Sequence, residues 1–251
     1  MLKLSLVTAS GTIASQEGSN EAVLVYHAPY TDGTSIRVET DTCPCHLIVR
    51  LDAVMEPVLV LMTEPAFLLP IPFGEKHVSY DPRSFQGDVH LLSVRRAMPA
   101  EVRAYRNLAL NPYDHHGNTA LFPHASANVE TRGESVFAAR NAIDGYRAAS
   151  GHGIWPYSSW GINRNPQAAL RIDFGTPVQL DQVVLYLRAD FPHDAWWEKA
   201  SLHFSDGSQS VLSLEKLDGA QRFPLEGKET SFIVLDTLLK ADDPSPFPAL
   251  T

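Results

Sequence analysis

Residues 170–187 hold the stretch that decides the fold: Leu170-Arg-Ile-Asp-Phe174 and, after Gly175, Val183-Val-Leu-Tyr-Leu187. Both segments place an apolar residue at every second position, and the intervening residues of the first segment are charged. A period of two is typical of a strand that buries one face. The stretch therefore predicts two half-buried β-strands.

Short segments of the same character recur along the chain, separated by turn signals such as Asp32-Gly33, Gly87-Asp88 and Asp206-Gly207. They are rich in β-branched and aliphatic residues and comprise residues 22–26, 35–39, 47–51, 58–62, 90–94, 201–205, 211–214 and 231–236. Residues 1–10 are also better interpreted as a strand than as a secretory signal, because they lack a basic segment followed by a sustained apolar run.

A short helix is predicted over residues 136–143. Thr131 and Glu134 precede it with the spacing of a capping box, and Gly145 would end it. Residues 99–110 are ambiguous and could form one helix or a closing strand.

The fold class predicted is all-β, with two β-sandwich domains. The Pro, Gly and Asn residues of Asn111-Pro-Tyr-Asp-His-His-Gly-Asn-Thr119 mark the boundary. We expect an N-terminal sandwich over residues 1–112, without an assigned role, and a second domain over residues 120–251.

Composition restricts the function. With 44% hydrophobic and 20% charged residues, the 251-residue chain is typical of a globular protein. A net charge of -9 and the lack of a Lys/Arg run disfavour nucleic acid and anionic membranes as partners. No apolar stretch is long enough to span a bilayer. Cys43 and Cys45, one residue apart, are interpreted as two thiols in a reducing compartment, so a cytoplasmic location is expected.

Three segments of the second half suggest a family. Asn141-Ala-Ile-Asp-Gly145, Ala169-Leu-Arg-Ile-Asp-Phe-Gly175 and Val183-Val-Leu-Tyr-Leu-Arg188 together resemble the discoidin-like, coagulation-factor type C domains, over roughly residues 125–251. The resemblance implies a galactose-binding-like jelly roll with binding loops at one end, and many bacterial members are carbohydrate-binding modules. Two departures are the long aromatic insertion over residues 146–165 and the lack of an obvious last strand after Phe247.

Aromatic residues crowd the loops that would bind a ligand. An aromatic ring can stack on the apolar face of a sugar while polar neighbours bond its hydroxyl groups. The candidate rings are Trp155, Tyr157, Trp160, Trp196 and Trp197, and the candidate polar groups are His152, Asn163, Arg188, Asp190, His193 and Asp194. Alternatively, these rings could close the end of the sandwich.

Arg188 follows the predicted strand directly and opens the segment that ends at Trp197. Its planar guanidinium could bind a sugar carboxylate or vicinal diol, with Asp190 and Asp194 orienting it. A structural Arg–Asp pair that fixes the loop is an equally good interpretation.

Asp144 occupies the position that the resemblance assigns to a structural calcium ligand. An Asp beside Gly145 is just as readily a turn former. No other cofactor is expected.

The function predicted is non-catalytic carbohydrate recognition. No His-Glu-x-x-His motif, Gly-x-Ser-x-Gly elbow or Gly-rich phosphate loop is present, which favours a protein that is not an enzyme. Two alternatives stay open: a carbohydrate-active hydrolase or lyase that uses paired carboxylates such as Asp194, and a protein-interaction module whose aromatic face forms a partner or homo-oligomer interface.

Overall fold

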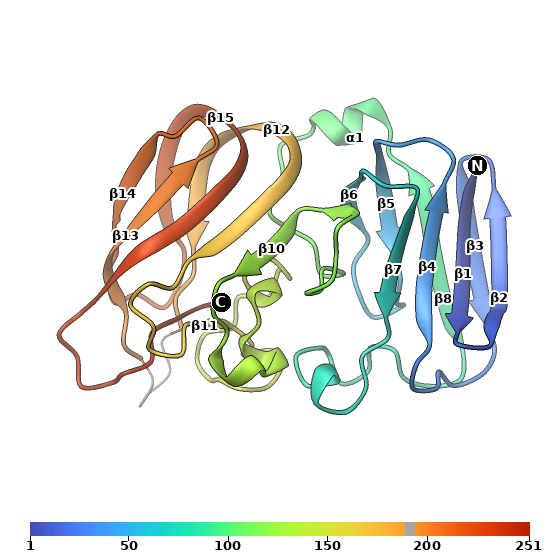
Figure 1. Ribbon diagram of the computed structural model, residues 1–251, viewed down its shortest axis with the longest axis horizontal. Helices are drawn as coiled ribbons and strands as arrows, with labels where there is room; N and C mark the ends of the chain where they lie inside the picture. Colours follow the sequence, from blue (N-terminus) through green and yellow to red (C-terminus); the bar gives the residue numbers. More distant parts are fainter. Residues whose placement is uncertain (189–193) are drawn as a thin grey trace.

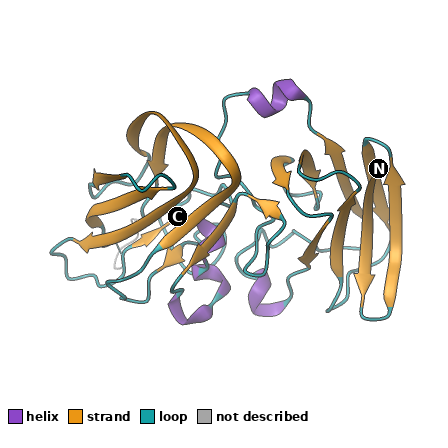
Figure 2. Ribbon diagram, turned by 45° about the horizontal axis from the view of Figure 1, so that its top comes forward, coloured by secondary structure: helices purple, strands orange, loops and turns teal. Residues whose placement is uncertain are grey.

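The computed structural model describes residues 1–188 and 194–251 and confirms the all-β class. Strands make up most of both halves, and helices are few and short (Figure 2). None of the helices in the described part of the chain has the length and apolar character that crossing a membrane requires.

The first half is a sandwich of two antiparallel sheets (Figure 1). One sheet has the order β2-β1-β4-β7 and consists of β1 (Leu2–Thr8), β2 (Gly11–Gly18), β4 (Ser35–Thr40) and β7 (Ala66–Pro70). The other has the order β3-β8-β5-β6-β9 and consists of β3 (Glu21–Tyr26), β5 (Cys45–Arg50), β6 (Val58–Met62), β8 (His90–Arg96) and β9 (Leu121–Phe122). Alternation decides which side chains face inward: Ala22 and Leu24 are buried, whereas Val23 and Val25 are exposed.

The second half contains a five-stranded antiparallel sheet and a short two-stranded one. The larger sheet has the order β10-β12-β15-β13-β14, with β10 (His124–Ala127), β12 (Leu170–Leu185), β13 (Trp197–Phe204), β14 (Gln209–Ser213) and β15 (Gln221–Lys240). The smaller sheet pairs β11 (Trp160–Gly161) with β16 (Ala249–Leu250).

The two strands predicted at residues 170–174 and 183–187 are one long strand, β12, so the predicted break is wrong. Its pairing with β15 shifts register between Asp173 and Val178 and again between Leu180 and Gln182. Such shifts let a strand bend from one layer of a sandwich into the other. Figure 1 shows that β12 and its partner β15 both curve along their length.

The helix predicted over residues 136–143 is also wrong. Two 3-10 turns, η3 (Ser135–Phe137) and η4 (Ala139–Ala142), are separated by Ala138, whose backbone is extended. The predicted capping box does not form, because Glu134 pairs with Arg132 and the Thr131 hydroxyl accepts the Asn163 N–H instead. The other helices are η1 (Gly74–His77), α1 (Pro99–Arg103), which resolves the ambiguity at residues 99–110, and η2 (Thr131–Gly133).

The buried apolar side chains form two clusters, one in each half. Tyr113 and Leu121 belong to the first cluster, and the second begins at Ala125. Among the buried side chains, the change from one core to the other therefore falls between Leu121 and Ala125, while the partly buried Leu108 and Ala109 already pack against the second core. The division into two domains at residues 112 and 120 stays a prediction.

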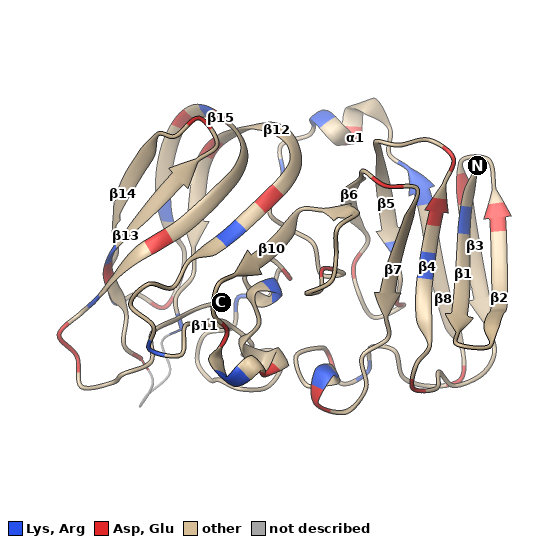
Figure 3. Ribbon diagram, in the orientation of Figure 1, with Lys and Arg blue, Asp and Glu red and all other residues tan. Residues whose placement is uncertain are grey.

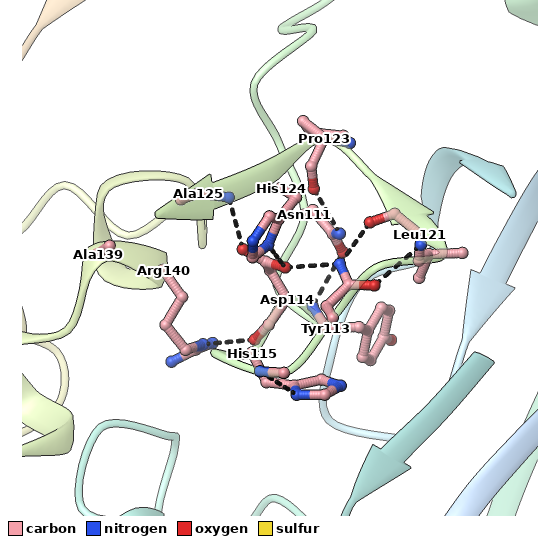
Figure 4. A network of polar contacts seen from close by, with 12 residues as sticks. Asn111, Tyr113, Asp114, His115, Leu121, Pro123, His124, Ala125, Ala139 and Arg140 are labelled. Atoms are coloured by element: carbon pink, nitrogen blue, oxygen red, sulfur yellow. Dashed lines mark hydrogen bonds and ion pairs between the residues drawn. The ribbon is translucent and has the colours of Figure 1, made fainter. Parts of the chain in front are cut away.

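Buried polar contacts join the two cores, and Figure 4 shows the central group. The Asp114 carboxylate, which is fully buried, accepts hydrogen bonds from His124 Nδ1 (2.8 Å), Asn118 Nδ2 (2.7 Å) and the Ala125 N–H (2.8 Å). Asn118 lies in the part of the chain that contributes to the first core, and Ala125 is the first buried residue of the second core. A single carboxylate thus stabilises the crossing between them.

Arg140 extends this connection from η4. Its buried guanidinium donates to the carbonyl oxygens of Asp114 (2.9 Å) and Pro112 (2.9 Å) and lies 4.3 Å from the centre of the Tyr80 ring. Close by, Ser135 donates its N–H to Glu75 Oε1 and its hydroxyl to the Glu75 carbonyl, both at 2.7 Å. The 3-10 turns of the second half are therefore attached to the first half.

Candidate functional site

A pocket of about 120 Å³ lies where β11 and β16 meet the loops beside them. We call it the Arg188 pocket. It is lined by Thr131, Arg132, Phe137, His152, residues 161–164, Arg188 and residues 247–249. This volume is below the range of roughly 300–1,000 Å³ that is usual for drug-sized ligands, so the pocket suits one small chemical group or ring.

Short strand pairing brings these distant segments together. β11 and β16 pair Trp160 with Leu250 and Gly161 with Ala249, and Leu187 forms an isolated bridge to Leu250. The Arg188 N–H donates to the Ala249 carbonyl at 3.0 Å. Arg188, three residues after the end of β12, therefore lies beside the turn after β11 and the start of β16.

A tight turn forms one wall. The Asn165 N–H donates to the Ile162 carbonyl at 2.8 Å, and both central residues are left-handed, Asn163 at φ 48° and Arg164 at φ 60°. Gly161 allows the wall to close, because a Cβ there would lie 2.6 Å from the Thr131 hydroxyl oxygen. The pocket thus depends on close backbone approach at Gly161.

Three arginines contribute positive charge. Arg132 forms a two-point ion pair with Glu134 (2.5 and 2.7 Å), which raises the pKa of the arginine and lowers that of the carboxyl. Arg164 is exposed and lies 4.4 Å from the centre of the Phe247 ring. Arg188 is 5% exposed and donates a hydrogen bond to the Phe247 carbonyl oxygen. Figure 3 shows the wider setting, in which both charge signs are spread over the chain.

The prediction that Trp160 and Trp197 contact a ligand is wrong. Their exposed fractions are 0% and 1%, and their ring centres lie 6.5 Å apart inside the second core. Trp160 Nε1 donates to the Val129 carbonyl at 3.0 Å. A sugar could not reach either indole without opening the core, so these two rings stabilise the sandwich.

Trp155 and Tyr157 are half-buried and lie in another environment. The Trp155 ring contacts the Tyr146 ring edge to face, with the ring centres 5.5 Å apart. The backbone N–H of Trp155 donates to the Val78 carbonyl of the first half. Tyr157 packs so close to Gly151 that a Cβ on the glycine would come within 2.8 Å of its ring. Both rings order the long loop, and a ligand role for them stays a prediction.

Asp194 and Trp196 form a third group, with Lys216. The Lys216 ammonium lies 2.9 Å from Asp194 Oδ2, 3.3 Å from Asp243 Oδ2 and 5.3 Å from the Trp196 ring centre. The Lys216 ammonium therefore pairs with both carboxylates, and Asp194 and Trp196 are held in a local structural group. The five aromatics and their polar neighbours therefore do not form the single surface that was predicted.

Asp190 and His193, the remaining predicted ligand contacts, lie outside the described residues. Of the nine predicted ligand residues, Arg188 lines the pocket, joined by His152 and Asn163, which the sequence also suggested as polar partners. Sequence reasoning missed Arg132, Arg164 and Phe247. The Asn-Arg-Asn-Pro run at residues 163–166 does signal a turn, but nothing in the sequence places Phe247 beside it.

The surroundings of Asp144 do not fit a calcium ion. Its Oδ2 atom is buried without a hydrogen-bond partner, but its charged neighbour is the Arg140 guanidinium, and calcium takes six to eight oxygen ligands. Among the described residues no group of three or more His, Cys, Asp or Glu side chains could hold a metal. Oδ1 instead accepts the Tyr146 N–H at 2.9 Å, which makes Asp144 a turn former.

Burial of Asp144 predicts a pH effect on stability. Burial raises its pKa from 3.8 to about 7, so between these values the folded chain keeps a proton that the unfolded chain releases. The free energy of unfolding should therefore fall as pH rises from about 4 to 7. Asp144→Asn keeps the bond to Tyr146 and removes the charge, and at pH 8 it should raise the free energy of unfolding by roughly 2–4 kcal/mol, since a shift of about three pKa units corresponds to about 4 kcal/mol.

Urea unfolding of both proteins at pH 4.5 and pH 8 measures this difference. Asp218→Asn, the same change at an exposed position, serves as the control and should have little effect at either pH. Equal stabilities of wild type and Asp144→Asn at pH 8 would contradict the prediction.

Comparisons with known proteins relate the chain to carbohydrate-binding modules by structure alone. No protein-family model and no curated protein matches it. It is similar to chitosan-binding module 1 of a Paenibacillus sp. IK-5 chitosanase/glucanase (13% identity, TM-score 0.39, covering 58% of this chain and 95% of the module). It is also similar to the C. perfringens NanJ family 32 module in complex with galactose (14% identity, TM-score 0.35, covering 51% of this chain and 92% of the module). A third similar structure is a Streptococcus pneumoniae fucose-binding module (12% identity, TM-score 0.38, covering 59% of this chain and 98% of the module). At these identities and scores, the similarity says nothing about which residues would contact a ligand.

Proposed function

We propose that this protein binds a carbohydrate, without catalysis, in the Arg188 pocket. The observation that carries the proposal is the composition of one small concave site, in which an apolar wall faces directional polar groups. Phe137, Phe247 and Pro248 supply the apolar wall, and Arg188 and Asn163 supply polar groups. A sugar ring presents the same combination of C–H faces and hydroxyl groups.

The fixed position of Arg188 supports a recognition role. Its backbone is bonded to Ala249 and its side chain to Phe247, so the guanidinium loses little freedom when a ligand binds. A planar guanidinium also offers several N–H donors in a fixed geometry, which suits neighbouring oxygens on a sugar ring. The proposed role is therefore directional bonding to ring oxygens.

The hydrolase alternative receives no comparable support. It requires Asp194 as one of a pair of carboxylates facing the substrate, whereas Asp194 is ion-paired with Lys216. The binding proposal needs only the geometry of the pocket.

Binding should depend on Phe247 and not on Trp196. We expect Phe247→Ala to weaken saccharide binding at least tenfold, because it removes the apolar wall, and Trp196→Ala to leave it unchanged. Calorimetric titration with a panel of neutral and acidic mono- and disaccharides measures this, with thermal unfolding to verify that each variant is folded.

Two outcomes would overturn the proposal. One is a folded wild-type protein that binds no member of the panel. The other is binding that Trp196→Ala abolishes and Phe247→Ala leaves intact, since the binding surface would then be the Lys216 group.

A further inference from the structure

The polar side chains that line the Arg188 pocket are mainly hydrogen-bond donors. They include three guanidinium groups, Arg132, Arg164 and Arg188, each with five N–H donors and no acceptor. The Thr131 hydroxyl oxygen is already engaged as the acceptor of the Asn163 N–H at 2.9 Å. Neutral sugar hydroxyls both donate and accept, so a lining of this kind favours a ligand with more acceptors than a neutral sugar has.

The three charges are not equivalent. Arg132 is balanced by its ion pair with Glu134, and Arg188 is buried and bonded to the Phe247 carbonyl. Arg164 is exposed at the rim of the pocket. Its contact with the Phe247 ring is a cation–π contact, which leaves its N–H groups able to donate hydrogen bonds to oxygen atoms of a ligand. Arg164 is therefore the cation best placed to meet an acidic group entering the pocket.

Two of these arginines, Arg132 and Arg164, have strained backbone conformations. Six non-glycine residues in the described part of the chain have left-handed φ angles, and Arg132 (54°), Asn163 (48°) and Arg164 (60°) all line this one pocket. Asn tolerates this region, whereas arginine is strained where glycine would not be. Strained residues concentrate at ligand sites, where the strain fixes a side chain in place.

From these observations we infer that the Arg188 pocket takes a sugar that carries a carboxylate, a uronic acid, with Arg164 and Arg188 as its cationic contacts. A carboxylate supplies acceptors for the N–H donors of the exposed Arg164 guanidinium, and its plane matches the plane of that group. The exposed Arg164 guanidinium favours an anion at this point of the surface, although the chain as a whole carries a net charge of -9. The inference rests on the proposed function and specifies its ligand.

Matched pairs of sugars test the inference. Galacturonic acid and galactose differ only at C6, as do glucuronic acid and glucose, and each is titrated into the full chain at low and at moderate salt. We expect one uronic acid to bind at least tenfold more tightly than its neutral partner. This advantage should shrink as salt is added, because the rim charge is exposed.

Two variants locate the effect. Arg164→Gln should reduce uronic acid binding about tenfold more than it reduces binding of the neutral partner, so that the variant loses most of the preference for the uronic acid. Arg222→Gln makes the same change of charge at an exposed position on β15 and should alter neither.

The outcomes separate this inference from the function beneath it. If neutral sugars bind as tightly as uronic acids, the inference is overturned and the proposed function survives. If no sugar of either kind binds the folded protein, both fail. Tighter binding of galactose 6-sulfate, or displacement of the uronic acid by inorganic sulfate at equal concentration, would also overturn the inference, because the pocket would then select a sulfate or any small anion.

Discussion

Arg140→Ala should lower the free energy of unfolding by about 3–5 kcal/mol, which is the largest effect expected for a single substitution here. The guanidinium is 8% exposed and bridges the two cores. Its removal leaves the carbonyl oxygens of Asp114 and Pro112 without these donors and takes away the cation that faces the Tyr80 ring. Each unsatisfied buried carbonyl costs about 1–3 kcal/mol.

Urea unfolding followed by tryptophan fluorescence measures this loss. Arg171→Ala is the matched control, because Arg171 likewise lies over a ring, Phe232, but its side chain is 39% exposed and pairs with the Asp173 carboxylate. It should cost about 1 kcal/mol or less. Equal losses in free energy of unfolding for the two variants would contradict the prediction, because Arg140 would then contribute no more to stability than a surface arginine does.

Asp114→Ala should cost about 2–4 kcal/mol and should also change how stability depends on pH. The substitution leaves the Ala125 N–H without an acceptor and removes the oxygen that receives Asn118 Nδ2 and His124 Nδ1. Because all three groups lie at the crossing between the cores, they cannot turn toward solvent without opening it. Asp242→Ala, at an exposed position, is the control and should have little effect.

The pH effect acts through His124. The hydrogen bond that His124 Nδ1 donates to Asp114 raises the pKa of His124 above 6.5, so the folded chain holds this proton more tightly than the unfolded chain does. The resulting stabilisation is fully present below pH 6.5 and is lost as pH rises through the folded pKa. Asp114→Ala should therefore cost more stability at pH 6 than at pH 9. A cost that is equal at both values would exclude an ionic contribution from the pair.

Much of the fold could be predicted because alternation is a local signal. The strands β3, β4, β5, β6 and β8 of the first half form where the sequence predicts them. The continuity of β12 could not be predicted, since Gly175 and Pro177 are ordinary strand breakers and only pairing with β15 carries the strand past them. β7 and β16 were missed for a related reason, because both are short and are defined by their partners.

The candidate site was harder to predict than the fold. Trp197 belongs to β13, but two register shifts between Trp197 and Ser201 hide its place in the alternation, so a core residue was interpreted as a loop residue. The Arg188 pocket is assembled from segments as far apart in the sequence as Thr131 and Ala249, joined by strands of two residues. Residue types alone could suggest Arg188, but no local pattern relates Phe247 or Arg132 to it.

The Ser135–Glu75 bonds have a practical consequence for anyone who wishes to isolate the second half. Two residues of the pocket, Arg132 and Phe137, flank Ser135, and that turn is fastened to a helix of the opposite half. A fragment cut at residue 120 would lose this anchor and leave Arg140 without Tyr80 and Pro112. The first half thus acts as a scaffold for the pocket, so an experiment on the pocket requires the whole chain.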